Sequence, residues 1–522
     1  MKYHSTRNKK LKYTSKEAIQ QGLSPEGGLF VPESIPQVTQ DELQKWIPMN
    51  YCQRAKRIFS LFLTDYSQEE LESCVEEAYT SAKFSSPETA PVVPMDEGLH
   101  VLELWHGPTS AFKDMALQIL PQFLTTAVRS STDPKEIVIL TATSGDTGKA
   151  AMVGFQDVPG TRIMVFYPRQ GVSSMQKLQM ATQEGNNVSV VAVNGNFDHA
   201  QTGVKEIFRN EELQENMDQS GFGFSSANSI NWGRLAPQIV YYFSAYLDLL
   251  KQGRIELGQE INVVVPTGNF GNILAAWYSR KMGLPLGRLI CASNDNKVLT
   301  DFIQTGVYDR RREFHQTISP SMDILISSNL ERLLYELSGR DDVQVNDWMK
   351  QLSENGYYKL EGTALEELQS IFWGGFATEQ QTRDAIYDTF KKSAYTMDPH
   401  TGVGKWVYDR YKEETGDKRV TLLVSTASPF KFPGDVLQAL HGNGPKKNGT
   451  EEHVEGENRI EKSVLAGNNM TTDDLQILDE LSKVSGMDIP KPLQNLGDQP
   501  VRHTDECEID KMVEHVSVFI GL

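Results

Sequence analysis

From residue 96 onward, short apolar and β-branched runs alternate with helical patterns, and this alternation limits the possible folds most strongly. Apolar strands that are each followed by a helix predict parallel sheets covered by helices on both faces. The predicted strands are Val101–Trp105, Ile137–Ala142, Arg162–Tyr167, Val188–Val193, Ile261–Val265, Leu289–Ala292 and Val420–Val424. The predicted helices include Thr147–Gln156, Ser173–Gln183, Asp198–Arg209, Arg234–Lys251 and Asn272–Met282. Ligands of such sheets bind in loops at the carboxyl ends of strands, so functional residues are expected there.

The segments outside this alternation predict additional helices. Capping signals at Thr39 and Ser67 mark two helix starts in the leader. The predicted segments are helices at Gln40–Leu61 and Gln68–Ala82, a mainly helical region at 320–395, a polar connection at 441–470 and one or two short helices at 471–522.

The charge of the chain excludes some classes of partner. The 522 residues carry 51 basic and 69 acidic side chains, a net charge of −18, which argues against nucleic acids and membrane surfaces as partners. No apolar run approaches the roughly 20 residues that span a bilayer. The cysteines are scattered, which predicts free thiols in a reducing compartment and a cytoplasmic protein. They are Cys52, Cys74, Cys291 and Cys507.

The stretch Trp105–Gln118, WHGPTSAFKDMALQ, places a lysine where a turn-rich segment becomes a helix. Lys113 lies just before a buried helical pattern that begins at Met115. The positive end of a helix and nearby apolar surface both disfavour a charged ammonium group, and so favour an amine nucleophile or base. Taken alone, the stretch is more typical of a solvated lysine at a helix start. The choice between a solvated lysine and a reactive amine therefore depends on the other loops.

Two loops at strand ends are suited to bind anions. Thr141–Gly148, TATSGDTG, offers hydroxyls and the free N–H groups of a helix start. Pro266–Asn272, PTGNFGN, adds two glycines that let the backbone approach an anion closely. The second loop matches neither GxxxxGK[ST] nor GxGxxG, so kinases and dinucleotide enzymes are poorly supported. Capped strand-to-helix turns are the alternative interpretation.

Three further loops add polar side chains. Ser226–Arg234, SANSINWGR, could bring asparagines, a serine and an arginine to a phosphate, or form a capping turn with a solvated arginine. Ser425–Pro433, STASPFKFP, places hydroxyls at the end of a strand. Asp398–Gly402 is a polar turn before a helix, and its His400 is more typical of a structural histidine than of a catalyst. No cluster of histidines or carboxylates suggests a metal site, and no GxSxG nucleophile is present.

Together these features suit pyridoxal phosphate. That cofactor needs a lysine for a Schiff base, a glycine-rich cradle for its phosphate and a partner for its pyridine nitrogen. One candidate lysine, two or three anion-binding loops and a hydroxyl at a strand end supply these parts.

The motifs also identify a family. HGPTSAFKDMALQ, TSGDTGKAA, NSINWGR, PTGNFGN, DPHTGVG and STASPFKFP occur in this order and together resemble threonine synthase, in the longer bacterial and fungal branch of that family. The leader fits too, with STRN at Ser5–Asn8 and GLSPEGGLFVP at Gly22–Pro32, so the resemblance covers roughly residues 1–435. Two positions depart from the family pattern: Asn8 replaces a glycine, and Ser428 replaces a histidine that many members carry.

The resemblance implies an α/β protein with the tryptophan-synthase-β-like fold of pyridoxal phosphate enzymes, fold type II. Two open parallel-sheet domains would flank the cofactor, with a helical module before them. The implied division is an N-terminal module at 1–95, a large cofactor-binding domain at 96–135 and 225–440, a small mobile substrate-side domain at 136–224, and a linker with a helical extension at 441–522.

The resemblance also implies site residues. Lys113 would hold the cofactor through a Schiff base and act as the catalytic lysine. The cofactor-binding residues would be Gly268, Asn269, Phe270, Gly271 and Asn272 at the phosphate, and Thr426, or alternatively Ser425, at the pyridine nitrogen. The substrate-binding residues would be Ser144, Gly145, Asp146 and Thr147 at the carboxylate, and Asn228, Ser229, Asn231 and Arg234 at a phosphate.

The implied reaction converts O-phospho-L-homoserine and water to L-threonine and phosphate, the last step of threonine biosynthesis. The protein would act on this small molecule as a monomer or homodimer. One alternative is another eliminating enzyme of the same fold, such as a serine/threonine dehydratase. The other is a phosphate-ligand-binding protein in which Lys113 is only a salt-bridge donor.

Overall fold

The computed structural model describes residues 1–143, 145–169, 172–442, 472–494 and 496–522. Ser144 and most of the polar connection predicted at 441–470 therefore lie outside the described residues. Among the residues that are described, no helix has both the length and the apolar surface needed to cross a membrane.

The larger sheet has six strands in the order β14-β11-β10-β15-β5-β4. The five adjacent strands from β14 to β5 run parallel to one another, and the edge strand β4 is antiparallel to β5. The strands are β4 (Val92–Asp96), β5 (Leu99–Glu103), β10 (Ile261–Pro266), β11 (Leu286–Ser293), β14 (Phe372–Phe376) and β15 (Thr421–Ser425). The parallel arrangement brings the carboxyl ends of β5, β10 and β15 to one edge of the sheet.

The smaller sheet has five parallel strands in the order β16-β8-β7-β6-β9. They are β6 (Glu136–Ala142), β7 (Thr161–Pro168), β8 (Val188–Val193), β9 (Phe222–Ser226) and β16 (Asp505–Cys507). The two parallel sheets confirm the predicted α/β class. The proposed domain limits stay a prediction.

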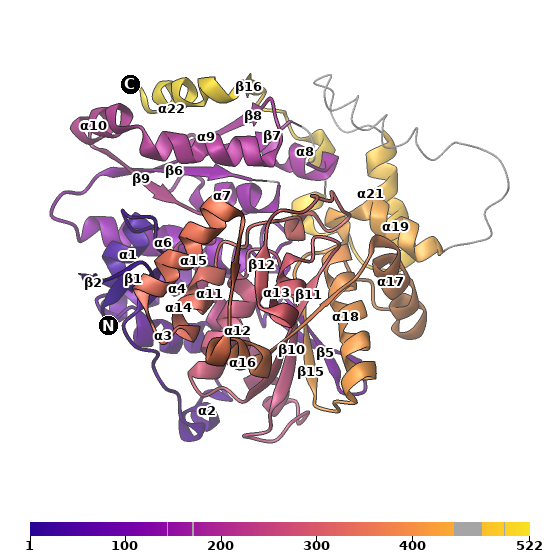
Figure 1. The fold of residues 1–522 in the computed structure, drawn as a ribbon. Helices are drawn as coiled ribbons and strands as arrows, with labels where there is room; N and C mark the ends of the chain where they lie inside the picture. Colours follow the sequence, from indigo (N-terminus) through magenta and orange to yellow (C-terminus); the bar gives the residue numbers. More distant parts are fainter. Residues whose placement is uncertain (144, 170–171, 443–471, 495) are drawn as a thin grey trace.

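Helices cover both sheets (Figure 1). The helices between the strands of the smaller sheet are α7 (Asp146–Phe155), α8 (Ser174–Ala181), α9 (Phe197–Arg209) and α10 (Glu211–Gln219). Those in and around the larger sheet are α5 (Asp114–Leu117), α6 (Leu120–Arg129), α11 (Trp232–Lys251), α12 (Gly271–Lys281), α13 (Val298–Thr305), α14 (Leu330–Leu337), α15 (Asp342–Asn355), α16 (Gly362–Ile371), α17 (Glu379–Ser393), α18 (Pro399–Thr415) and α19 (Pro433–His441). The tail adds α21 (Thr472–Ser485) and α22 (Met512–Ile520).

The N-terminal module shares its apolar core with the larger sheet. It comprises the antiparallel strands β1 (Tyr3–Ser5), β2 (Asn8–Tyr13) and β3 (Phe30–Pro32), and the helices α1 (Ser15–Gln21), α2 (Gln40–Trp46), α3 (Tyr51–Phe62) and α4 (Gln68–Ala78). The capping boxes predicted at Thr39 and Ser67 are present.

Three predictions about elements were wrong or incomplete. The single helix expected at Gln40–Leu61 is two helices, because Asn50 and Gln53 form a capping box that starts α3. The region 320–395 contains β14 and the short strand β13 (Tyr357–Lys359), which pairs with β12 (Val307–Asp309), in addition to its helices. The tail was expected to add only helices, yet β16 pairs with β8 and extends the smaller sheet.

Candidate active site

Lys113 lies at the start of α5, as predicted. Its side chain is buried, with 8% of the residue exposed. The Lys113 Nζ lies 3.4 Å from Asp146 Oδ2 and 3.2 Å from Ser321 Oγ, and 5.0 Å from the centre of the Phe112 ring. Burial lowers the pKa of Lys113, and the carboxylate of Asp146 offsets this only in part. The lysine is therefore not the solvated side chain that the stretch alone would suggest.

Asp146 begins α7 and connects the smaller sheet to Lys113. Its Oδ1 lies 2.9 Å from Lys431 Nζ and accepts a 2.8 Å hydrogen bond from Gln176 Nε2. Burial alone would raise the pKa of Asp146, but the ammonium groups of Lys431 and Lys113 outweigh burial and hold that pKa well below its usual range. The Asp146 side chain is therefore a carboxylate at neutral pH.

The PTGNFGN loop joins β10 to α12 and leaves the start of α12 without a side-chain cap. Phe270 takes a left-handed conformation there, with φ of 65°. A Cβ on Gly268 would lie 2.5 Å from the carbonyl oxygen of Ser321, so only glycine fits at this close approach. Asn272 accepts hydrogen bonds from two tyrosines, Tyr241 and Tyr242, through Oδ1.

Two buried amides beside this loop have no partner among the described residues. They are Nδ2 of Asn272 and Nδ2 of Asn329. Asn329 Nδ2 would be 3.4 Å from a Cβ on Gly271, so it lies at the start of α12. Buried donors without partners carry a free-energy cost unless a ligand satisfies them, and the free N–H groups of a helix start favour an anion. The loop therefore fits the phosphate of pyridoxal phosphate.

The serines and the asparagine at 327–329 support the same loop. Ser327 Oγ donates to the Gly268 carbonyl at 2.8 Å, and the Asn329 backbone N–H donates to the Asn269 carbonyl at 3.1 Å. Sequence reasoning missed this segment because the charge-rich region around it predicted only helices. The hydroxyl and amide side chains within TISPSMDILISSN, together with its proline, were the available signal.

The SANSINWGR turn contributes a buried cation. Arg234 is 2% exposed and donates to the Ala227 carbonyl through Nη1, while its Nε has no partner among the described residues. Burial lowers the pKa of Arg234 to about 10. Ser229 Oγ lies 3.3 Å from Ser328 Oγ, and Asn228 is partly exposed beside it. This turn and the 327–329 segment thus meet next to the PTGNFGN loop.

Asn231 has a different environment from its neighbours in the turn. Its Nδ2 donates to the carbonyls of Ile19 and Ser226, at 2.9 and 3.1 Å, and its Oδ1 accepts from the Gly233 N–H at 2.8 Å. These bonds use both N–H donors and the acceptor, and the residue is fully buried.

The loop after β15 lies against the Lys113 loop. The Phe112 N–H donates to the Thr426 carbonyl at 2.8 Å, and the Ser428 N–H donates to the Ser110 carbonyl at 3.0 Å. Ser428, the departure from the family pattern, is fully buried and caps the short helix η2 (Pro429–Lys431).

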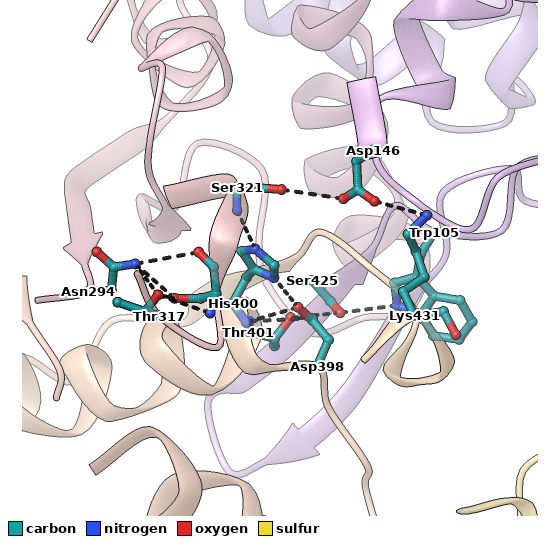
Figure 2. A network of polar contacts seen from close by, with 12 residues as sticks. Trp105, Asp146, Asn294, Thr317, Ser321, Asp398, His400, Thr401, Ser425 and Lys431 are labelled. Atoms are coloured by element: carbon teal, nitrogen blue, oxygen red, sulfur yellow. Dashed lines mark hydrogen bonds and ion pairs between the residues drawn. The ribbon is translucent and has the colours of Figure 1, made fainter. Parts of the chain in front are cut away.

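The two hydroxyls at the end of β15 differ in their partners. Ser425 Oγ lies 3.1 Å from both Trp105 Nε1 and Thr401 Oγ1, and it accepts from each (Figure 2). The Thr426 hydroxyl makes no hydrogen bond to another described residue, and the side chain is 6% exposed. Ser425 keeps its own O–H donor, but the Thr426 hydroxyl has both its donor and its acceptor sites available for a ligand.

Ser321, in the short helix η1 (Pro320–Met322), joins Asp146 to a buried polar network (Figure 2). Its Oγ is also in contact with Lys113 Nζ. Its Oγ lies 3.4 Å from Asp146 Oδ2, and its backbone N–H donates to His400 Nε2 at 3.1 Å. Asp398 Oδ1 lies 2.8 Å from His400 Nδ1. His400 is a hydrogen-bonded structural histidine here, in agreement with the sequence analysis.

The predicted loops therefore converge around Lys113, together with residues that the sequence analysis did not select. The added residues are Gln176, Ser321, Ser327, Asn329 and Lys431. Lys431 belongs to the STASPFKFP motif, but only the hydroxyls of that motif were considered.

Comparisons with known proteins identify the family. Residues 2–79 match the family described as threonine synthase N terminus, and residues 90–367 match pyridoxal-phosphate dependent enzymes. The chain is 36% identical over 468 residues to threonine synthase of Saccharomyces cerevisiae, covering 84% of this chain and 89% of that protein. The crystal structure of pyridoxal phosphate-bound threonine synthase from Brucella melitensis superposes with a TM-score of 0.83 at 32% identity, covering 99% of each chain.

A second kind of relative is longer. The chain is 41% identical over 434 residues to threonine synthase-like 1 of Macaca fascicularis, covering 81% of this chain. The match spans 58% of the length of that relative. The fold, the PTGNFGN loop and both family matches all indicate a pyridoxal-phosphate enzyme. The predicted fold type is confirmed. The chain belongs to the threonine synthase family of pyridoxal-phosphate dependent enzymes.

Proposed function

We propose that the protein is a threonine synthase, which converts O-phospho-L-homoserine and water to L-threonine and phosphate as the last step of threonine biosynthesis. The observation that carries the proposal is the buried Lys113 amine, 3.4 Å from Asp146 and 3.2 Å from Ser321, facing loops suited to a phosphate. Bound pyridoxal phosphate supplies a sink for the electrons released when a proton leaves the α-carbon of an amino acid.

The residues around the cofactor have separate roles in this proposal. Lys113 forms the covalent link to the cofactor. The start of α12, Gly268–Asn272, binds the cofactor phosphate, with the amides of Asn272 and Asn329 as additional donors. Thr426 meets the pyridine nitrogen, because its hydroxyl has no partner among the described residues, whereas Ser425 Oγ is held between Trp105 and Thr401.

The substrate carboxylate would bind at the start of α7. Gly145 and Thr147 lie at the positive end of this helix, where Thr143 Oγ1 already accepts from the N–H groups of Gly145 and Gly148. We assign Ser144 to the same set from the sequence motif. The Asp146 side chain is itself a carboxylate and would repel another one, so we assign the binding to the backbone of the loop. Asp146 instead faces the Lys113 amine.

The substrate phosphate would bind at the SANSINWGR turn. Arg234 is a buried guanidinium with a donor that no described residue accepts, and Asn228 and Ser229 lie beside it. A phosphate would satisfy this donor through a charge-assisted hydrogen bond. Asn231 holds the turn in shape, since its amide is already fully bonded within the protein.

Lys113 would also move the protons of the reaction. Burial favours its neutral amine, which can remove a proton from the α-carbon of the substrate. Loss of a β-proton then expels phosphate from the γ-carbon. A proton is added to the γ-carbon, which becomes a methyl group, water adds its hydroxyl at the β-carbon, and a proton returns to the α-carbon. The buried site limits access of bulk water before phosphate has left.

Arg234 distinguishes this function from the dehydratase alternative, because serine and threonine carry no phosphate for the buried guanidinium. The test incubates purified protein with O-phospho-L-homoserine, L-serine or L-threonine and measures phosphate, threonine and 2-oxo acids. We expect equal amounts of phosphate and threonine from the first substrate and no turnover of the other two. Phosphate accompanied by 2-oxobutyrate would indicate elimination without addition of water, and turnover of serine alone would support the dehydratase.

The Lys113→Ala variant tests the assigned lysine, and Lys10→Ala is the matched control at an exposed lysine in the leader. We expect Lys113→Ala to lose turnover together with the visible absorption band that borohydride removes from the unsubstituted protein. Lys10→Ala should retain both. Equal rates in all three proteins would contradict the role of Lys113, and absence of the band from reconstituted protein would leave only the phosphate-binding alternative.

A further inference from the structure

Lys431 is a buried cation that the proposed reaction does not use. It is 0% exposed, and its Nζ has three acceptors: Asp146 Oδ1 at 2.9 Å, the Thr109 carbonyl at 3.0 Å and Gln179 Oε1 at 3.1 Å. An ammonium group has three N–H donors, so these contacts satisfy the charged form of the side chain completely. A buried charge that is paired and fully hydrogen-bonded is stable in that form.

Lys113 faces the same carboxylate with weaker contacts. Its Nζ lies 3.4 Å from Asp146 Oδ2 and 3.2 Å from Ser321 Oγ, both longer than the contact between Lys431 and Asp146. The Asp146 carboxylate therefore interacts with two buried lysines, and its contact with Lys431 is the shorter of the two.

The charge balance then decides the state of Lys113. With Lys431 positive and Asp146 negative, a neutral Lys113 makes the group of three neutral, whereas a protonated Lys113 leaves one buried positive charge. Among the other charged groups nearby, Arg234 on α11 opposes that proton. Lys149 on α7 and Asp114 beside Lys113, whose pKa burial raises to about 6, both interact with Lys431. His400 faces Ser321 from α18 through Nε2 as an acceptor.

We propose that Lys431 is a positioning residue for Lys113: by pairing with Asp146, it leaves Lys113 as a neutral amine that can take up the cofactor and move protons. This inference rests on the proposed function only for the use of that amine. The arrangement of charge itself belongs to the chain without cofactor or substrate, and it can be tested there.

Charge changes at the two partners should shift the Lys113 pKa in opposite directions. In Lys431→Met, Asp146 keeps Lys113 as its remaining ammonium partner, so the pKa of Lys113 rises by about one to three units. In Asp146→Asn, Lys431 remains as an uncompensated cation, so the pKa of Lys113 falls. In the double variant both charges are gone, and the pKa returns toward that of the unsubstituted protein.

The measurement is competitive acetylation of the full chain, freed of cofactor with hydroxylamine. Trace acetic anhydride is added at a series of pH values, and mass spectrometry of the Lys113 peptide gives the pKa of that amine. Lys431→Arg is the matched control, because it keeps the charge and should keep the pKa. Circular dichroism establishes that each variant is folded, and Lys431→Gln replaces Lys431→Met if the latter does not fold.

A merely structural role for Lys431 gives a different pattern. Loosening of the site would expose Lys113 to water and move its pKa toward the usual value of about 10.4 in every variant, the double variant included. An unchanged or lower pKa in Lys431→Met and Lys431→Gln, or a raised one in Asp146→Asn, would overturn the inference. Because O-phospho-L-homoserine is not used, failure of the proposed reaction would not produce any of these outcomes.

Uptake of pyridoxal phosphate gives a second readout. Below the pKa, each unit of increase lowers the fraction of free amine about tenfold. At a pH well below the Lys113 pKa measured for Lys431→Arg, the visible band of added pyridoxal phosphate should therefore appear at least about tenfold more slowly in Lys431→Met than in Lys431→Arg. Equal rates in these two variants would also contradict the inference.

Discussion

The backbone N–H of Ser321 donates to Nε2 of His400 at 3.1 Å, which ties the turn facing Lys113 to the start of α18. Asp398 orients the ring through Nδ1, at 2.8 Å. The turn that carries the Ser321 hydroxyl is thus positioned by a histidine that does not itself reach Lys113.

Replacement of His400 should therefore slow the reaction without removing the cofactor. In His400→Phe the Ser321 N–H loses its acceptor, which costs about 1 kcal/mol and lowers kcat about fivefold. His400→Gln can still offer an acceptor and should retain more activity. The exposed His441→Phe serves as the control. A kcat for His400→Phe equal to that of His441→Phe would show that this contact does not position Ser321.

The close approach of Gly268 to Ser321 predicts a loss of cofactor affinity. In Gly268→Ala the new Cβ would lie 2.5 Å from a backbone oxygen, so the loop must move. We expect the Kd for pyridoxal phosphate, measured by absorbance titration, to rise at least about tenfold, which corresponds to about 1.4 kcal/mol. At Gly434 no atom lies within 4 Å of an added Cβ, so Gly434→Ala should bind the cofactor normally. Equal affinities would refute the steric argument.

The ion pair between Arg7 and Glu331 predicts that the N-terminal module stabilises α14. Arg7 donates to Glu331 through Nε at 2.9 Å and Nη2 at 2.7 Å, and Glu331 is largely buried. Arg7→Met leaves that carboxylate without its cation, at an expected cost of about 2–3 kcal/mol in unfolding free energy. The exposed pair of Lys12 and Glu33 offers a control, since Lys12→Met should cost less than about 0.5 kcal/mol.

Urea unfolding of these variants measures both costs. Arg7→Met combined with Glu331→Met should recover part of the loss, because no unpaired charge remains. A double variant less stable than the sum of the two single changes would contradict the assigned cause.

His4 predicts sensitivity to acid in the same module. Burial, with smaller contributions from Lys12 and Arg340, lowers the pKa of His4 to about 4 from the usual 6.5. Between these values the unfolded chain binds the proton and the folded chain does not, so stability present above pH 6.5 is lost as the pH falls toward 4. We expect about 1–2 kcal/mol of loss from this residue, detectable as a lower Tm. In His4→Gln the Tm should depend less on pH over this window; an identical dependence would exclude His4 as a cause.

The sequence predicted the parts of the protein that depend on local pattern. The parallel strands, the capping boxes at Thr39 and Ser67, and the convergence of the loops at strand ends all follow from periodicity and loop chemistry. Lys113 could be placed at a helix start because the turn and the apolar helix lie on either side of it in the chain.

The residues that the sequence did not reveal act through contacts between distant segments. Lys431 reaches Asp146 from a position 285 residues later in the chain, and Ser321 reaches His400 across 79 residues. No local pattern marks a lysine as buried when its acceptors come from other elements. Asn231 illustrates the converse. Its motif suggested a contact with a ligand, but its side-chain amide forms hydrogen bonds to backbone groups of the protein.

The pairing of β16 with β8 has a consequence for how the chain acquires its structure during synthesis. Asp505–Cys507 pairs with Val191–Val193, more than 300 residues earlier in the chain. Until Asp505–Cys507 has been synthesised and has left the ribosome, the edge of β8 has no neighbour on that side and presents unpaired backbone groups. The apolar side chains of α9 that α22 covers stay uncovered for the same interval. The nascent smaller sheet therefore stays incomplete, with exposed apolar and backbone groups, long after its first four strands have been synthesised.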